Sequence, residues 1–437
     1  MTPVQPDPAA LADRLLADIA KQLGRPLPAR YEAALQATPR HLFLPDRLWL
    51  RDGAGGYRPC DKNTDPDGWW TAAYTDTPLV TQFTDGAPSS SASMPSMVLR
   101  SLLLAATKGA EPGAVLELGT GTGFNAALLC ALYGQDRVTT LELDETLAAQ
   151  ATTRLKAAGH APHVAVADAS TDLPGNGMYD MVVATFSVDR VPAHWLRRCR
   201  PGGRIVTPWF SDWCAYGTAA LDVTPGHGAG GRFHPFGSYM AMRTQAVPGI
   251  SNSLTQQGSS LPGAQSMTGL SPWAVAGGDL DAEFHLGLAV PGVSYAWDSS
   301  GEHVPTRLWL YGADGSSFAA IDYDGTQAEQ FTVTQQGPRH LWGEISAAYA
   351  RWSQLGRPTV DRHGLTLSPD GTQRVWIDSP ESVLATEGDH DLNAAAAGLE
   401  LKEALALAKY HERQRSGTAS TGIPHAEART RLGLDHD

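Results

Sequence analysis

Three closely spaced glycines, followed later by a glutamate, form the pattern with the clearest chemical meaning in this chain. Gly119, Gly121 and Gly123 lie in VLELGTGTGF, where an apolar run meets a helical pattern. Glycine lets such a turn adopt positive φ and approach a ligand, and the first N–H groups of the helix point toward it. Glu142 ends the next apolar run, where a carboxylate can accept hydrogen bonds from a ribose diol. The pattern predicts a nucleoside site; a ligand-free turn and a surface carboxylate are the alternatives.

Further polar positions could take part in the same chemistry. Asp168 ends a third apolar run, so its carboxylate can reach either a ligand at that sheet edge or the first N–H groups of a following helix. Upstream, the segment SSSASMP places several serine hydroxyls, which can donate hydrogen bonds, in one short stretch. The serine-rich segment 84–93 is also typical of a flexible polar loop.

Strands and helices alternate in the stretch that must position these residues. We expect strands at 114–119, 137–143, 163–168, 179–186 and 202–210, and helices at 123–133, 145–158 and 191–199. Strands separated by helices of this length pair in parallel through right-handed crossovers, with both faces of the sheet covered. The expected fold is therefore a doubly wound α/β sheet.

The remainder of the chain suggests an additional unit. An amphipathic helix opens the fold within 8–35, residues 51–70 indicate a loop, and a Ser-, Gly- and Gln-rich linker follows residue 245. Beyond it we expect strands at 283–290, 306–311, 317–322 and 329–333, and helices at 340–354 and 393–410. The predicted domains are 1–245, which carries the glycine motif, 246–385, an α+β accessory region, and 386–437, a helix with a polar tail.

Composition narrows the classes of function. A chain of 437 residues with a net charge of −13 lacks the dense basic face that nucleic-acid binding requires. Its four cysteines lie far apart, so we expect neither a metal site nor a disulfide framework. No apolar run approaches the ~18 residues of a membrane span, and we expect a reduced, cytoplasmic protein without membrane contact. Oligomeric state is left open.

Several segments, in order, resemble the protein-L-isoaspartate O-methyltransferase family. VLELGTGTGFNAALLCAL is similar to the family's first motif, usually close to VLEIGTGSGYQAALLA. The other similar segments are TPRHLFLPD (38–46), AAYTDTPLV (72–80), YDMVVATFSVDRVPAHWLRRCRPGGRIVTP (179–208) and GGRFHPF (230–236). The resemblance covers about residues 10–245. It implies a Rossmann-like class I methyltransferase fold and S-adenosylmethionine as cofactor.

The resemblance also implies roles for particular residues. The cofactor would be bound by Glu117, Gly119, Thr120, Gly121, Gly123, Phe124, Glu142, Leu143, Asp168 and Ala169. Ser93 and Ser91 occupy the Ser and Thr positions of the family's GQTISQP loop and would donate hydrogen bonds to the acceptor carboxylate. Tyr74 and Asp76, in the AAYTDTPLV segment, would shape the site.

Departures from the family pattern bear on the substrate. The glycine and both glutamines of GQTISQP are absent, the small TAAAP wall becomes TFSVD with Phe186, and a Trp-rich insertion carries Trp69 and Trp70. Residues 338–380 resemble an extension of actinobacterial members encoded beside ribosomal peptide natural products such as lanthipeptides and graspetides. Trp342, Trp352 and Trp376 are expected to fill a small core, and the functional alternative is that this region is a platform for the substrate peptide.

Three functions follow from these features. The first is methylation of an aspartate side chain in a modified ribosomal peptide, which leads through a succinimide to isoaspartate. The alternatives are repair of isoaspartate in proteins, and a nucleotide- or peptide-binding module without activity. The partner in either enzymatic case is a peptide or protein that carries an Asp or isoAsp carboxylate.

Overall fold

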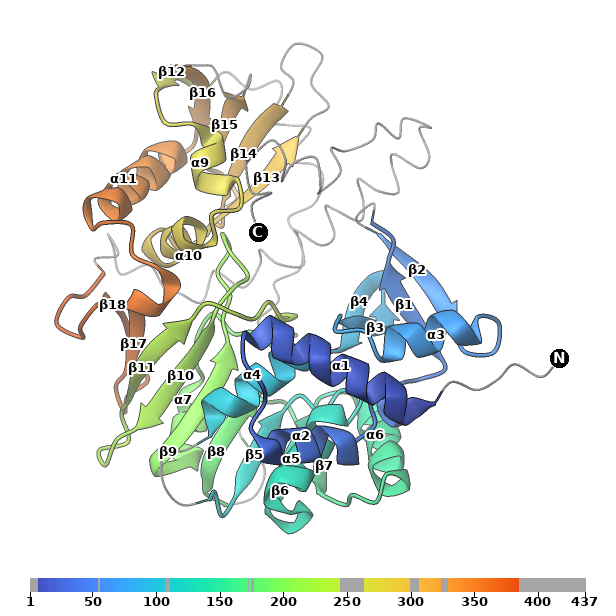
Figure 1. Cartoon of the computed structure of the whole chain (residues 1–437). Helices are drawn as coiled ribbons and strands as arrows, with labels where there is room; N and C mark the ends of the chain where they lie inside the picture. Colours follow the sequence, from blue (N-terminus) through green and yellow to red (C-terminus); the bar gives the residue numbers. More distant parts are fainter. Residues whose placement is uncertain are drawn as a thin grey trace.

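The computed structural model of the protein describes residues 7–53, 56–106, 111–171, 173, 177–243, 263–298, 306–323 and 329–384. Its strands form a central nine-stranded sheet, a small four-stranded sheet on the N-terminal side and a five-stranded sheet on the C-terminal side (Figure 1).

The central sheet is built on the alternating strands and helices that the sequence predicts. Its strands are β5 (Val115–Leu118), β6 (Val138–Glu142), β7 (His163–Val166), β8 (Tyr179–Ala184), β9 (Cys199–Pro208), β10 (Thr218–Val223), β11 (Ala229–His234), β17 (His363–Leu367) and β18 (Gln373–Ile377). The helices of this region are α4 (Pro95–Ala105), α5 (Phe124–Tyr133), α6 (Glu145–Ala157) and α7 (Ala193–Arg198), with a short 3₁₀ turn, η2 (Gln135–Arg137). The strand order is β18-β17-β11-β10-β9-β8-β5-β6-β7.

Pairing in this sheet is parallel from β7 to β9 and antiparallel from β9 to β18. Successive residues of one strand point to opposite faces, so Val115 and Leu116 enter two different hydrophobic cores. Both faces of the sheet are therefore buried, and the prediction of a doubly wound α/β fold is confirmed.

The N-terminal region supplies helices and the small sheet. Its elements are α1 (Pro8–Leu23), α2 (Ala29–Ala37), η1 (Arg40–Phe43), β1 (Arg47–Arg51), β2 (Tyr57–Asp61), α3 (Pro66–Ala73), β3 (Leu79–Thr84) and β4 (Ala87–Ala92). The sheet order is β2-β1-β3-β4. The prediction of loops at 51–70 and 84–93 was wrong, because the first range contains β2 and α3 and the second pairs with β3 as a hairpin.

The C-terminal region forms an α+β unit. Its elements are β12 (Ala264–Thr268), α9 (Pro272–Ala276), α10 (Leu280–Ala289), β13 (Val293–Asp298), β14 (Thr306–Gly312), β15 (Phe318–Tyr323), β16 (Phe331–Gln336), α11 (Leu341–Gln354) and η3 (Val360–Arg362). Residues 283–290 were expected as a strand, but they lie mostly in α10. The Asp279 side chain caps this helix, and the helix is buried on nearly all sides, so its apolar run lacks a helical period.

The last two strands do not stay with the accessory unit. β17 pairs with β11 and β18 with β17, so residues 363–377 extend the central sheet although the sequence placed them in the 246–385 domain. The accessory unit is thus inserted between two parts of one sheet. The helix expected at 393–410 and the region 386–437 lie outside the described residues.

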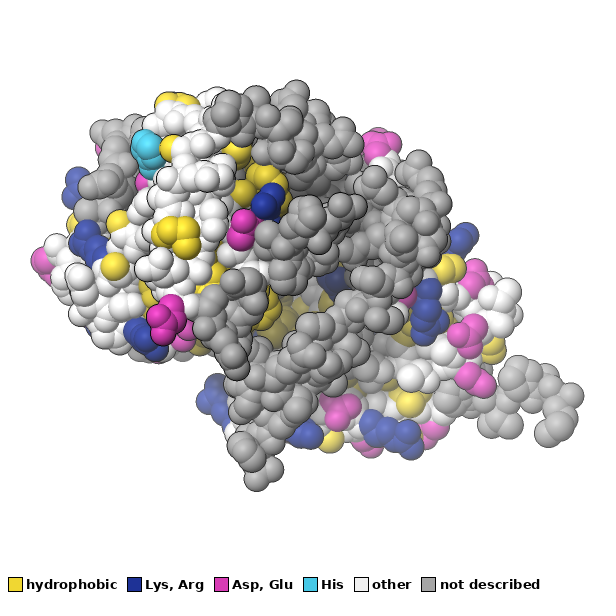
Figure 2. All heavy atoms as spheres, turned by 90° about the horizontal axis from the view of Figure 1, so that it is seen from above, with side chains coloured by type: hydrophobic (Ala, Val, Ile, Leu, Met, Phe, Trp, Pro, Cys, Tyr) yellow, Lys and Arg dark blue, Asp and Glu magenta, His cyan; other side chains and the backbone are white. Residues whose placement is uncertain are grey.

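The surface shows no large area of one charge on the face drawn in Figure 2, as far as the described residues are visible there. Basic and acidic side chains are interspersed around the outline, and hydrophobic side chains appear in the hollow between its two parts. Among the helices of the described ranges, none combines the length and apolar character of a membrane span.

Candidate active site

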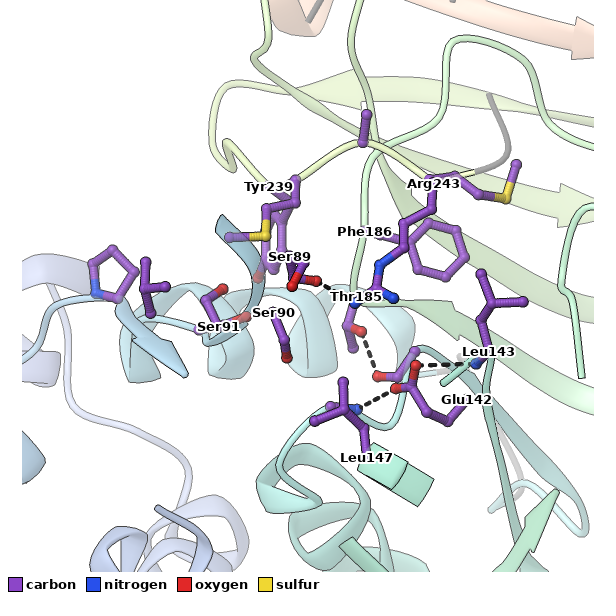
Figure 3. Close-up of a pocket in the computed structure, with 18 of the residues that line it drawn as sticks. Ser89, Ser90, Ser91, Glu142, Leu143, Leu147, Thr185, Phe186, Tyr239 and Arg243 are labelled. Carbon is purple, nitrogen blue, oxygen red and sulfur yellow. Dashed lines mark hydrogen bonds between the residues drawn. The ribbon is translucent and has the colours of Figure 1, made fainter. Parts of the chain in front are cut away.

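A cavity of about 590 Å³ lies at the carboxyl ends of the parallel strands, where ligands bind in such sheets. Its walls come from the glycine turn, the ends of β6 and β8, the β3–β4 hairpin and the chain after β11 (Figure 3). The residues predicted from sequence that line it are Ser91, Ser93, Gly119, Gly121, Glu142, Leu143, Asp168, Ala169 and Phe186. The cavity thus brings together the predicted cofactor and acceptor residues.

The glycine turn requires glycine for two different reasons. Gly119, Gly121 and Gly123 all have positive φ, at 93°, 53° and 90°. A Cβ on Gly119 would lie 2.5 Å from the Thr185 hydroxyl, whereas one on Gly121 would meet nothing closer than 3.9 Å and would project into open space. Gly121 therefore keeps the backbone accessible at the cavity wall, and Gly119 permits close packing behind it.

The Glu142 carboxylate is fixed at the end of β6 by three backbone N–H groups. Gly121 N donates to Oε2 at 2.8 Å, and Leu143 N and Asp144 N donate to Oε1 at 3.0 and 3.2 Å. A carboxylate oriented in this way lines the cavity and retains acceptor capacity for a ligand diol. Leu143, which is 42% exposed, adds an apolar surface beside it.

Asp168 makes a local backbone contact and also lies at the cavity wall. Its carboxylate accepts a hydrogen bond from Ser170 N at 2.8 Å, as a local capping residue does. It also lines the cavity, as does the neighbouring Ala169. A contact from Asp168 to a bound ligand remains a prediction.

Glu117 does not reach the cavity, which corrects the prediction of a direct cofactor contact. Its side chain is fully buried behind the glycine turn, where Asn125 Nδ2 donates to it at 2.7 Å and the Thr140 hydroxyl also donates to it. Burial raises the pKa of Glu117 to about 7. Thr120, Gly123 and Phe124 likewise do not line the cavity, so these residues support the turn.

The serines that the sequence assigned to a loop are held by the β3–β4 hairpin. Ser91 pairs with Val80 across the two strands, and Ser93 follows the end of β4. Both side chains are half-buried and line the cavity. A hairpin restricts these hydroxyls more than a flexible connector would, which favours a defined hydrogen-bonding role.

Tyr74 and Asp76 do not line the cavity, so neither is placed for a direct contact with the acceptor, and their role in shaping the site stays a prediction. Asp76 accepts a hydrogen bond from Ser96 N at 2.8 Å, at the start of α4. The Tyr74 hydroxyl lies 2.6 Å from His41 Nδ1, and burial raises the pKa of Tyr74 to about 12. Both residues position their neighbours.

Arg40 holds the serine segment (residues 89–93) in place through hydrogen bonds to its backbone, a role that the sequence reasoning missed. The buried guanidinium donates hydrogen bonds to carbonyl oxygens just before β3 and at the end of β4. Its nitrogen atoms lie 2.9–3.2 Å from the carbonyl oxygens of Thr75, Thr77, Ala92 and Ser93. Burial lowers the pKa of Arg40 to about 10, and the nearby Asp76 carboxylate opposes this shift. The arginine of TPRHLFLPD was visible as part of a motif, but its carbonyl partners depend on the folded hairpin.

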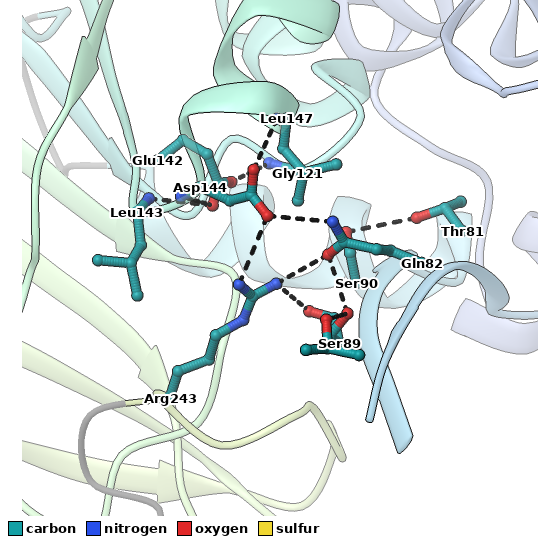
Figure 4. A network of polar contacts seen from close by, with 11 residues as sticks. Thr81, Gln82, Ser89, Ser90, Gly121, Glu142, Leu143, Asp144, Leu147 and Arg243 are labelled. Atoms are coloured by element: carbon teal, nitrogen blue, oxygen red, sulfur yellow. Dashed lines mark hydrogen bonds and ion pairs between the residues drawn. The ribbon is translucent and has the colours of Figure 1, made fainter. Parts of the chain in front are cut away.

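A polar network joins the hairpin to the cofactor side of the cavity (Figure 4). Gln82 Nε2 donates to Asp144 Oδ2 at 3.0 Å, while Ser89 Oγ donates to Gln82 Oε1 at 2.9 Å. Arg243, which follows β11, donates to Gln82 Oε1 at 3.1 Å and to the Ser89 carbonyl, and it lies 3.8 Å from Asp144. Sequence reasoning missed Gln82 and Arg243, because no local pattern relates segments so far apart.

The family model that matches the chain is "Protein-L-isoaspartate(D-aspartate) O-methyltransferase (PCMT)", over residues 63–212. A protein-L-isoaspartate O-methyltransferase of Ignicoccus hospitalis is 33% identical over 177 residues, which cover 40% of this chain and 71% of that protein. The corresponding protein of Methanosarcina mazei is 35% identical over 139 residues, covering 31% of this chain and 54% of its own length.

Solved structures of similar fold include two with related names. One protein-L-isoaspartate O-methyltransferase has a TM-score of 0.46 and 17% identity, with 84% of this chain and all of that chain covered. A putative protein-L-isoaspartate O-methyltransferase of Plasmodium falciparum, solved with S-adenosyl-L-homocysteine, has a TM-score of 0.39 and 12% identity, with 54% and 98% covered.

Proposed function

Because the chain belongs to the protein-L-isoaspartate O-methyltransferase family, and is thus an S-adenosylmethionine-dependent O-methyltransferase, we propose that it methylates isoaspartyl carboxylates in peptides or proteins. One observation supports this most directly. A single cavity contains the glycine turn and Glu142 on one side and the Ser91 and Ser93 hydroxyls on the other. The arrangement suits a nucleoside cofactor and a carboxylate acceptor in one cavity.

The residues around the glycine turn fit S-adenosylmethionine. The open side of Gly121 leaves room for a ligand against the backbone, and Glu142 offers acceptor oxygens for ribose hydroxyls. Leu143, Asp168 and Ala169 would surround the base. When bound, the cofactor supplies an electrophilic methyl group.

The chain's own residues need to hold the acceptor and do not need to deprotonate it. A carboxylic acid with a pKa near 4 is already ionised at pH 7, so no general base is required. The Ser91 and Ser93 hydroxyls can donate hydrogen bonds to the acceptor and hold one oxygen in line with the methyl group, at about 3 Å. Apolar residues such as Met94, Met97 and Phe186 in the cavity wall reduce access of water.

A second candidate is methylation of an ordinary aspartate in a modified ribosomal peptide. The inserted α+β unit and the presence of Phe186 in the cavity wall favour a specialised substrate. The resemblance of 338–380 to a natural-product extension supports the same idea and stays a prediction. The comparisons give more support to the isoaspartyl substrate, which we therefore place first.

Incubation with methyl-labelled S-adenosylmethionine tests whether the acceptor is an isoaspartyl or an ordinary aspartyl carboxylate. We expect label to enter an isoaspartyl hexapeptide and not its aspartyl counterpart of the same sequence. The label should be released as methanol at alkaline pH, because it forms an ester. Transfer to neither peptide by an enzyme that binds S-adenosylhomocysteine would contradict the isoaspartyl proposal and favour a constrained aspartyl peptide.

A further inference from the structure

Beyond the acceptor carboxylate, the small N-terminal sheet carries a row of alternating aromatic and basic side chains. This row, the aromatic–arginine surface, consists of Arg47, Trp49, Arg51, Tyr57 and Phe83. Phe83 lies between the other two rings, with centroids 5.1 Å from Trp49 and 5.6 Å from Tyr57. The Arg47 guanidinium stacks over Trp49 at 5.4 Å and that of Arg51 over Tyr57 at 5.3 Å.

The pleat of the strands explains why these side chains share a face. Arg47, Trp49 and Arg51 alternate along β1 with Leu48 and Leu50, which pack into the hydrophobic core. Tyr57 pairs directly with Arg51 in the ladder between β1 and β2. The five residues therefore lie on the face of the small sheet that points away from that core.

The surface is continuous with the active-site cavity. Arg51 and Tyr57 line the cavity, together with Val80 of the adjoining β3. A chain that placed its acceptor carboxylate near Ser91 and Ser93 could therefore continue from the cavity onto this surface. The aromatic rings offer contact area for peptide groups, and the guanidinium groups offer donors for carboxylates.

The charge of the surface identifies the kind of peptide. Arg47 and Arg51 are exposed, and within the described ranges neither forms an ion pair with a carboxylate of this chain. Unpaired arginines held against aromatic rings are notable in a protein of net charge −13. Such groups attract an anionic partner, and their stacked position lowers the entropy lost when they bind.

We propose that the aromatic–arginine surface binds acidic residues that flank the methyl-acceptor residue, so that the enzyme prefers acidic peptide segments. This inference rests on the proposed function of the cavity, and it adds a substrate preference to it. The contacts lie at the rim of the site, so the preference affects KM more than kcat.

Three isoaspartyl peptides test the preference. They carry two Glu, two Gln or two Lys residues on each side of the acceptor, and methyl transfer is measured at 150 mM salt, where exposed charges more than about 8 Å apart are largely screened. We expect KM to be about tenfold lower for the Glu peptide than for the Lys peptide, with similar kcat. Equal KM values for all three would overturn the proposal and leave the isoaspartyl function intact.

A charge reversal separates recognition from a structural role. In the double variant Arg47→Glu/Arg51→Glu, the order of the peptides should invert, with the Lys peptide showing the lowest KM. A variant that is merely misfolded would lose methyl transfer to all three peptides equally. The control is Arg58→Glu, which makes one such charge reversal instead of two; Arg58 lies on β2, one residue from Tyr57 and on the opposite face of the strand. Arg58→Glu should keep the wild-type order, and an inverted order there would contradict the assigned face.

Binding measured without turnover keeps the two proposals distinguishable. Anisotropy of rhodamine-labelled peptides, in the presence of S-adenosylhomocysteine, should show tighter binding of the Glu peptide than of the Lys peptide, and the double variant should invert that order. If no peptide were methylated but this binding pattern persisted, the isoaspartyl function would fail and the surface assignment would stand. Tighter binding of a single-stranded oligonucleotide than of every peptide would contradict the acidic-peptide assignment.

Discussion

Glu142 is the residue that we propose binds the ribose of the cofactor. Three backbone N–H groups orient it at the cavity wall, so its geometry is set before any ligand binds. Replacement by alanine should weaken binding of S-adenosylhomocysteine by roughly 10- to 100-fold, since hydrogen bonds to a charged group contribute about 1.5–3 kcal/mol. Titration calorimetry measures this loss, and unchanged affinity would contradict the assignment.

Glu142→Asp provides the companion measurement. It keeps the charge at the end of β6 but shortens the side chain, so the carboxylate can no longer meet both the Gly121 N–H group and a ligand. We expect affinity between those of the wild type and the alanine variant. Similar far-ultraviolet circular dichroism spectra of the wild type, Glu142→Ala and Glu142→Asp would show that all three proteins are folded.

Ser93 and Ser91 line the cavity, and we propose that their hydroxyls hold the acceptor carboxylate. Ser93→Ala should lower kcat/KM for an isoaspartyl peptide by about tenfold, as expected for one lost hydrogen bond near 1 kcal/mol plus poorer alignment. Affinity for S-adenosylhomocysteine should change little, because this hydroxyl faces the acceptor. Ser93→Thr retains the hydroxyl and should recover part of the activity, whereas equal loss in both variants would indicate a steric role instead.

At the scale of elements, the junction between α10 and β17 contains two buried histidines. His363 Nδ1 lies 3.0 Å from the Thr359 carbonyl and therefore carries the proton, which leaves its Nε2 to accept from His285 Nδ1 at 3.0 Å. Burial, reinforced by the mutual proximity of the rings, lowers the pKa of His285 to about 3, and burial lowers that of His363 to about 4. Both histidines are neutral in the folded protein at pH 7.

This junction should weaken in acid. Because the folded pKa values lie below that of an unfolded histidine, near 6.5, the stabilisation is complete above pH 6.5 and decreases as the pH falls toward 4. We expect the free energy of unfolding to fall by about 2 kcal/mol per histidine between pH 7 and pH 5, measured by urea denaturation. His285→Gln should reduce this slope, and His340→Gln, at an exposed position, should not. Equal slopes in all three proteins would contradict the assignment.

At the scale of the whole molecule, the accessory unit and the methyltransferase sheet each bury a large side chain of the other, and we expect their stability to be mutually dependent. Trp213, in the loop after β9, is 1% exposed within the core of the accessory unit, and its Nε1 donates to the Val275 carbonyl at 3.1 Å. In return, Phe284 of α10 packs into the core of the central sheet against Phe233. The two regions therefore do not separate at the boundary that the sequence suggested.

Truncation after residue 245 tests this dependence. Loss of β17, β18 and α10 would expose retained side chains such as Phe233 and Trp213, which are now at most 1% exposed, and each large apolar side chain contributes about 1.5–3 kcal/mol when buried. We expect the fragment to aggregate or to unfold without a cooperative transition in calorimetry. A fragment that unfolded cooperatively and bound S-adenosylhomocysteine as the full chain does would show that the first 245 residues are an independent domain.

The sequence alone determined the features that depend on neighbouring residues. The alternation of apolar strands and helices from 114 to 208, the positive-φ glycines and the acid at the end of β6 are all local, because backbone conformation and strand-end position follow from short stretches of chain. The sequence also identified Ser91 and Ser93 by motif, although it assigned the segment to a loop.

Tertiary structure decided what depends on partners far along the chain. The serine segment becomes a strand because β3 satisfies its backbone, and Glu117 turns inward because Thr140 and Asn125 supply its hydrogen bonds. β17 pairs with β11 although more than a hundred residues separate them in the sequence, and Arg243 donates a hydrogen bond to Gln82 over a similarly long separation. Hydrogen bonding and burial between distant segments leave no periodicity in a single sequence, so only the folded chain could reveal them.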